Sequence, residues 1–179
     1  ELLKTPGLVT ILMASILTIT ASDLLSTYLP LLGTERYIGV AYIGTILSVR
    51  SAASILSRFG FASMIRIVGR RRLTVLTMIC AGLGFIGLAL PIPLYGLYVA
   101  SAIMGVGLGI SSTLSVSSIA EIVPPASRGT AMTIRITGNR LGQVLVPILA
   151  SLIAASAGAA GVLAIIGVNL IGSAIAVQR

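Results

Sequence analysis

Long apolar runs separated by short polar or proline-containing segments are the main pattern along this chain of 179 residues. A helix that crosses a bilayer needs about 20 mostly apolar residues. Unbroken runs of that length favour helices over the alternating strands of about ten residues that build outer-membrane barrels. The pattern predicts an all-α protein with six membrane-spanning helices, at residues 6–32, 37–65, 73–90, 94–120, 129–155 and 160–177.

Two of these boundaries depend on proline and glycine rather than on charge. No charged residue lies between Leu73 and Ala120, and this stretch is too long for one span. Pro91 and Pro93 divide it, because proline removes a backbone donor and disfavours helix in the residue before it. The small-residue stretch 156–161 is expected to form the turn before the last helix.

The composition agrees with a membrane protein and changes the meaning of the charge. Hydrophobic residues make up 56% of the chain and charged residues 9%, against about 25% charged in a soluble domain. A formal net charge of +8 would suggest nucleic acid if the protein were soluble. Here many arginines lie inside or beside apolar runs with few aromatic residues among them, so the expected surrounding is the lipid bilayer and no nucleic-acid partner is expected.

Basic residues between the spans predict the orientation. In an up-and-down bundle one side carries only Glu35 and Arg36, whereas the other side carries most of the positive charge. The basic residues of that second side are Lys4, Arg66, Arg70, Arg71, Arg72, Arg128 and Arg179. The positive-inside rule therefore predicts that both termini are cytoplasmic, in a plasma membrane or the inner membrane of a bacterium.

The sequence contains few of the residue types that catalysis or metal binding requires. The chain has no His, and its one cysteine, Cys80, lies in an uncharged apolar run. A Ser-His-Asp triad, a His-based metal site and a disulfide within the chain are therefore excluded. No pair of nucleophile and base is visible, so neither an enzyme nor a cofactor or metal is expected.

Ionisable residues inside the spans are the candidates for function. A charge near the bilayer centre costs at least about 2.5–3.5 kcal/mol, so it usually faces a bundle interior or an aqueous cavity. Arg50 and Arg140 lie near the midpoints of the second and fifth spans, and Asp23 lies beyond the midpoint of the first. We expect these three side chains to line a central cavity and contact a substrate or coupling ion. The alternative is that they form structural ion pairs.

Two amides accompany Arg140 at the same depth. Asn139 and Gln143 add hydrogen-bond donors and acceptors suited to a small polar ligand, although interhelical hydrogen bonding explains them equally well. Arg58 and Arg135 lie nearer the cytoplasmic ends, where long side chains extend toward the membrane interface. For these two arginines a structural role is favoured.

Glycines are spaced for close helix packing. Gly105, Gly107 and Gly109 form a Gly-x-Gly-x-Gly run, and Gly138 and Gly142 form a Gly-x-x-x-Gly pair. Small residues at this spacing let helix backbones approach closely in lipid. A nucleotide-binding loop is disfavoured, because no strand precedes the first run and it lies in mid-membrane.

Six helices with a basic loop after the second resemble the carboxy-terminal half of a major facilitator superfamily (MFS) transporter. In the loop, Gly69, Arg70 and Arg71 match the family signature G-x-L-x-D-R-x-G-R-R, whereas Ala62 replaces its first glycine and Arg66 its aspartate.

A second segment carries the same resemblance. The stretch from Glu121 through Pro124 and Pro125 to Arg128 and Gly129 is similar to the acidic-then-Arg-Gly link that enters helix eleven in the family. Together the two segments and the helix pattern extend the resemblance over essentially the whole chain.

This resemblance implies an inverted 3+3 repeat and a substrate site near the midplane. Residues 1–179 would then form one six-helix domain of a twelve-helix protein. The site would lie between this domain and an amino-terminal six-helix half, or a second copy of the chain. Gly69, Arg70 and Arg71 would act in a cytoplasmic gate; the alternative is that they set topology and contact anionic lipid.

The leading functional hypothesis is a secondary active transporter of a small organic solute. Arg50 and Arg140 outnumber Asp23, which favours an anion, and an acidic group would carry proton coupling. A multidrug efflux transporter is a near alternative. A six-helix scaffold or regulatory membrane protein, which moves no solute, is the alternative from another class, and it would require Arg50 and Arg140 to be paired internally.

Overall fold

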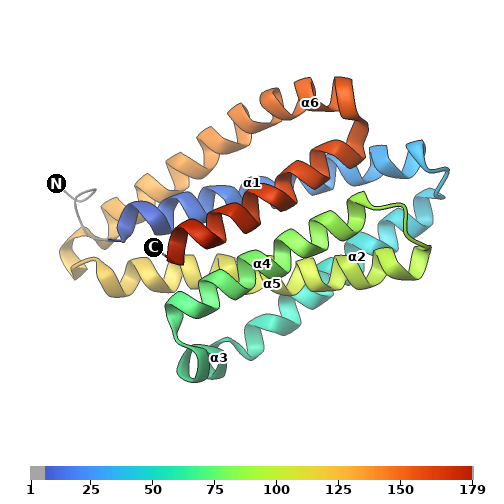
Figure 1. The fold of residues 1–179 in the computed structure, drawn as a ribbon. Helices are drawn as coiled ribbons and strands as arrows, with labels where there is room; N and C mark the ends of the chain where they lie inside the picture. The colour runs from blue at the N-terminus through green and yellow to red at the C-terminus, as the bar shows by residue number, and fades with distance from the viewer. Residues whose placement is uncertain (1–6, 179) are drawn as a thin grey trace.

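The protein is an up-and-down bundle of long helices, with no strand in the part of the chain that the structure describes (Figure 1). The computed structural model describes residues 7–178 and the side chains of residues 7–175. The helices are α1 (Leu8–Glu35), α2 (Val40–Phe59), α3 (Phe61–Val68), α4 (Arg70–Ala89), α5 (Leu94–Ile122) and α6 (Arg128–Gln178), with the 3-10 turn η2 (Pro125–Ser127) before α6. All of these α-helices except the short α3 are long and apolar enough to cross a membrane.

Helix α6 consists of two membrane-length arms joined at a bend. Gly158 has φ 65° and ψ −173°, which interrupts the helix within its 51 residues. This backbone region is essentially restricted to glycine. Figure 1 shows the second arm turning back toward the end of the bundle where the first arm begins. The turn expected at residues 156–161 is therefore present.

The segment predicted as one span at 37–65 has a different form in the structure. Gly60 ends α2, and the residues that follow form the separate helix α3, which has no buried residue. Gly69, with φ 80°, then connects α3 to α4. A Cβ on Gly69 would meet nothing within 4 Å, so glycine is favoured here by backbone conformation alone.

Alternating glycines bring α5 against two neighbouring helices. A Cβ on Gly105 would clash with the carbonyl oxygen of Arg50 on α2. A Cβ on Gly107 would lie 2.6 Å from the carbonyl oxygen of Thr77 on α4, and Gly109 faces α2 again one turn later. The packing role predicted for this glycine run is confirmed.

Two consecutive residues at the end of α1 cap two other helices. The Glu35 carboxylate accepts a hydrogen bond from the backbone N–H of Ala159, at 3.0 Å, where the second arm of α6 begins. Arg36 donates to the carbonyl oxygens of residues 88–90 at the end of α4. Each charge suits the dipole of the helix end that it meets, negative at an N-terminus and positive at a C-terminus.

Helix α2 has the least coverage of the long helices. Only Ile43 and Ile46 are buried along its 20 residues. The first arm of α6 is also open, with large exposed side chains that include Leu141, Val144 and Leu145. The large apolar side chains of these surfaces face lipid or another helix bundle rather than water, and α2 also exposes Ser48, Ser51 and Arg58.

The start of α1 and the end of α6 lie at one end of the bundle, together with η2 (Figure 1). This end also carries the basic loop between α3 and α4. Lys4 and Arg179, which contribute to the predicted orientation, lie outside the described residues, as does Pro6, where the first predicted span begins. The side of the membrane that this end faces stays a prediction.

Replacing Gly105 with Ala is expected to destabilise the protein by about 1–3 kcal/mol, because the added methyl group meets backbone rather than a movable side chain. Gly44→Ala is the matched control on α2, where a Cβ meets nothing within 4 Å. Alanine favours a helix over glycine by up to about 1 kcal/mol, so the control should be neutral or slightly stabilising. The measurement is the midpoint of thermal unfolding in detergent. Equal midpoints for the two variants would contradict the close contact between α2 and α5.

Candidate functional site

Three of the predicted site residues form one hydrogen-bonded chain between α1 and α6. Gln143 donates through Nε2 to a carboxylate oxygen of Asp23 at 2.7 Å. Arg140 donates in turn to Oε1 of Gln143 at 2.8 Å. The chain Arg140–Gln143–Asp23 therefore crosses between the two helices near the middle of α1 and of the first arm of α6.

Arg50 reaches the same region from α2. Its Nη1 donates to the hydroxyl of Ser22, the residue before Asp23, at 2.8 Å. Its Nε is buried and has no hydrogen-bond partner among residues 7–175. Within those residues no arginine nitrogen lies within 4.0 Å of the Asp23 carboxylate. Arg50 and Arg140 thus flank the carboxylate without forming a direct ion pair with it.

Asn139 takes part in a separate contact between helices. Its Oδ1 accepts a hydrogen bond from Ser15 on α1 at 3.3 Å, and the side chain is buried. Ser15 also accepts from Nε of Arg135 at 2.9 Å, and the same Nε lies 3.1 Å from the hydroxyl of Ser115 on α5. This arrangement fits the interhelical alternative for Asn139, and a ligand-binding role for it stays a prediction.

Arg135 does not have the surroundings expected of an arginine that extends toward the membrane interface. It is half-buried, and its hydrogen bonds to α1 and α5 direct it into the bundle. Together with Arg58 from α2 it lines a cavity of about 420 Å³. The two arginines assigned a structural role from sequence therefore share one polar cavity.

A second cavity, of about 150 Å³, adjoins the first at the central residues. Asp23 and Arg50 line it, together with Ser22. Arg58 and Ser112 line both cavities, so a polar groove continues from the middle of the bundle toward its basic end.

An apolar cavity of about 280 Å³ lies elsewhere, between α1 and the two arms of α6. Thr20 and Asn169 are the polar residues that line it, and no charged side chain does. It lacks the groups that could recognise a charged or strongly polar ligand, so the polar groove is the candidate site.

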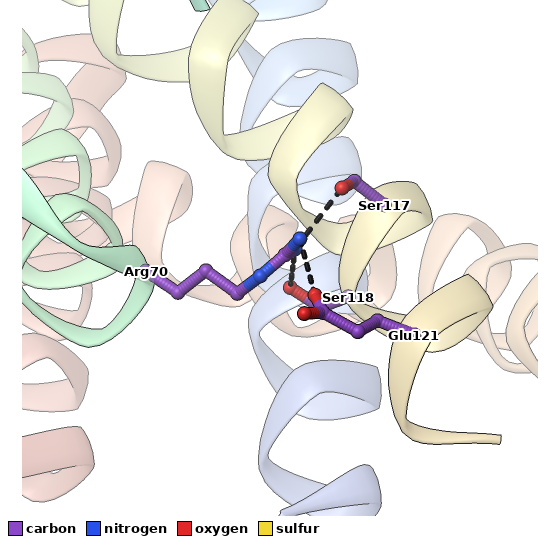
Figure 2. Close-up of polar contacts among 4 residues, drawn as sticks. All are labelled: Arg70, Ser117, Ser118 and Glu121. Atoms are coloured by element: carbon purple, nitrogen blue, oxygen red, sulfur yellow. Dashed lines mark hydrogen bonds and ion pairs between the residues drawn. The ribbon is translucent and has the colours of Figure 1, made fainter. Parts of the chain in front are cut away.

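Figure 2 shows Arg70, the first residue of α4, reaching the end of α5. Arg70 forms an ion pair with Glu121 and donates hydrogen bonds to Ser117 at 3.0 Å and Ser118 at 3.2 Å. Arg70 therefore ties the start of α4 to the end of α5.

The other two residues of the predicted gate have different surroundings. Gly69 provides the positive-φ backbone that precedes Arg70, and the Arg71 side chain is exposed. A gating role for Gly69, Arg70 and Arg71 stays a prediction.

Sequence reasoning missed the hydroxyl groups of α1 that contact the arginines. Ser22 binds Arg50 and Ser15 binds Arg135, while Thr18 lies between them and contacts Ser111 on α5 at 3.0 Å. Positions 15, 18 and 22 follow the i, i+3, i+7 spacing of one helix face. That spacing was the available signal.

The long apolar helices and the polar groups held between them define an integral multi-pass membrane protein. Residues 11–178 match the Major Facilitator Superfamily, and the chain belongs to this family. The resemblance inferred from the loop motifs is therefore confirmed. The family is a class of membrane transporters rather than of enzymes.

Two solved structures share the fold. The MFS proton:xylose symporter XylE, bound to 6-bromo-6-deoxy-D-glucose, gives a TM-score of 0.81 at 18% identity, covering 96% of this chain and 43% of that chain. The peptide transporter POT in complex with alafosfalin gives a TM-score of 0.75 at 16% identity, covering 96% of this chain and 37% of that chain. The chain thus spans about two fifths of the length of these transporters. Comparison with curated proteins found no match.

A double-mutant cycle tests the contact between Arg70 and Glu121. Arg70→Gln and Glu121→Gln are each expected to lower the midpoint of thermal unfolding, and the double variant should lose less than the sum. Because both side chains are partly exposed, the expected coupling is about 0.2–1 kcal/mol. Arg72→Gln, which changes an exposed residue of the same turn, is the control and should be additive with Glu121→Gln. Additive losses for Arg70 and Glu121 would refute the pair.

Proposed function

We propose that the complete protein is a secondary active transporter that moves a small organic solute by alternating access. The observation that carries the proposal is the Arg140–Gln143–Asp23 chain, with Arg50 beside it, in the middle of helices apolar enough to span a membrane. Ionisable groups at such depth mark substrate and ion pathways. Membership of a transporter family supports the same conclusion.

The site needs a partner bundle to enclose it. Asp23 and Arg140 are exposed in this half, and α2 beside them is mostly uncovered. An amino-terminal six-helix half of the same polypeptide would cover these residues, and a second copy of the chain is the alternative. The length of the related transporters favours the first arrangement. The proposed location is a plasma membrane, the inner membrane in a bacterium.

The solute is proposed to carry a negative charge. Arg50 and Arg140 place two positive charges around the single carboxylate of Asp23. In a site of low dielectric constant, an unbalanced positive charge is costly, so a ligand that brings a negative charge is favoured. The planar guanidinium group is also well matched to a carboxylate or phosphate.

Proton coupling is proposed to occur at Asp23. Its carboxylate accepts the hydrogen bond of Gln143 and lies next to the residue that binds Arg50. Protonation would remove the negative charge from this cluster and change the charge balance that the solute meets. XylE, which shares the fold, is a proton:xylose symporter, and this supports proton coupling here.

The basic end of the bundle is proposed to act as a gate. Arg70 joins α4 to α5 through Glu121, and Gly69 sets the backbone that leads into it. We place Gly69, Arg70 and Arg71 at the interface with the partner bundle, where they would regulate opening toward the cytoplasm.

Removal of either central arginine tests the function. Arg50→Gln and Arg140→Gln are expected to lower uptake of an anionic solute at least about tenfold, because each removes a positive charge that would hold the anion through a charge-assisted hydrogen bond. The measurement is flux of labelled mono- and dicarboxylates into proteoliposomes that contain the complete protein, compared with empty liposomes. Arg66→Gln is the matched control, since it removes one positive charge from an exposed position on α3.

The outcomes of this flux assay separate the alternatives. Unchanged uptake in both arginine variants would contradict an anionic solute. No flux of any solute through the unaltered protein would favour a scaffold or regulatory protein. Protection of cells against many unrelated toxic compounds would favour multidrug efflux.

Asp23→Asn tests proton coupling independently. The variant is expected to lose accumulation driven by a pH gradient and to retain exchange of labelled for unlabelled solute, because the amide carries no titratable proton. Both quantities are measured in the same proteoliposomes. Accumulation that still follows the pH gradient would exclude Asp23 as the coupling residue.

A further inference from the structure

We propose that Arg58 and Arg135 form a second binding subsite, specific for an oxyanion group such as a carboxylate or a phosphate. The subsite lies between the central residues and the basic end of the bundle. The two arginines come from α2 and the first arm of α6, and both line the cavity of about 420 Å³. Neither arginine belongs to the Arg140–Gln143–Asp23 chain.

Arg135 is fixed in position by its own hydrogen bonds. Its Nε lies 2.9 Å from the hydroxyl of Ser15 and 3.1 Å from that of Ser115, which anchors the guanidinium between α1 and α5. Its two terminal nitrogens have no hydrogen-bond partner among residues 7–175. A guanidinium has five N–H donors in a rigid fork, so the four terminal donors remain for a ligand.

Arg58 complements Arg135 from the opposite helix. Across the described side chains it forms no hydrogen bond or ion pair, and it lines both cavities of the polar groove. Its side chain is exposed, so its N–H groups are accessible from the open side of the larger cavity. A ligand between the two arginines would receive donors from two sides, and two guanidinium groups suit the planar oxygens of carboxylate or phosphate.

The remaining lining of the cavity favours an anion over a cation. Besides the two arginines the cavity is lined by Ser112, Thr113, Val116 and Ser117, so it contains no carboxylate. Ser117 accepts a hydrogen bond from Arg70 at 3.0 Å, which leaves its own hydroxyl proton for a ligand oxygen. Two positive charges with no acidic partner would repel a cation and stabilise an anion.

The subsite continues into the central region. Arg58 and Ser112 also line the smaller cavity that contains Arg50 and Asp23. An oxyanion could therefore move from one arginine to the next along a polar surface. We assign the subsite to the first binding of solute from the basic side. This place on a transport route rests on the proposed function, whereas the binding of an oxyanion does not.

Equilibrium binding tests the subsite without any need for transport. Labelled succinate and inorganic phosphate are titrated against the complete protein in nanodiscs of neutral lipid. Arg58→Gln and Arg135→Gln are each expected to raise the Kd of at least one probe about tenfold, the loss expected for one charge-assisted hydrogen bond. Arg66→Gln is the matched control and should leave the Kd unchanged.

Arg58→Gln is the decisive variant, because Arg58 has no hydrogen bond within the described side chains whose loss would disturb folding. Arg135→Gln also removes contacts to Ser15 and Ser115, so its thermal midpoint is measured beside its Kd. An unchanged Kd in Arg58→Gln would overturn the proposal. No saturable binding of either probe to the unaltered protein would also overturn it.

A second arm separates a soluble anion from a lipid headgroup. The same titrations are repeated in nanodiscs that contain phosphatidylglycerol, and the retained lipid is quantified for each variant. If Arg58→Gln changes only the retention of phosphatidylglycerol, a headgroup occupies the cavity and a solute subsite is refuted. If Arg58→Gln changes neither the flux nor the Kd, the subsite is refuted and the proposed transport function is unaffected. Binding without any flux would contradict the proposed function and leave the subsite standing.

Discussion

The arrangement of this bundle depends on the cost of placing a charge against hydrocarbon. Arg50, Arg140 and Asp23 lie in the middle of apolar helices, and the structure gathers them on one face formed by α1, α2 and the first arm of α6. Close helix packing makes this possible. Gly105 brings α5 against the backbone of Arg50 itself, so a candidate site residue lies at a close approach of two helices.

Much of the helical architecture could be predicted from sequence because bilayer thickness fixes the length of an apolar run. Two helix boundaries have no charged residue to mark them. They could be predicted from Pro91 and Pro93 and from the small residues around Gly158. The break at Gly60 was missed, since Phe59 and Phe61 continue the apolar run through it. A single glycine inside such a run does not show whether the chain will bend there.

The depth of the candidate site could also be predicted, because a helix rises 1.5 Å per residue. The partners of each residue could not, since they depend on how each helix is rotated toward its neighbours. Ser15 and Arg135 are 120 residues apart and meet only because α1 and α6 pack together. Asn139 and Gln143 are one helical turn apart, yet the first joins Ser15 and the second joins Asp23.

At one end of the bundle, the adjacent residues Glu35 and Arg36 connect α1 to α4 and to the second arm of α6 by hydrogen bonds. At the other end, Arg70 and Glu121 fasten α4 to α5. Helix α4 takes part in both sets of contacts, so it is held to a neighbouring helix at each of its ends. Helix α2 and the first arm of α6 take part in neither of these two sets of contacts. The helices that carry Arg50 and Arg140 are thus held by contacts along their length, such as those of Gly105 and Arg135, rather than by a charged residue at either end.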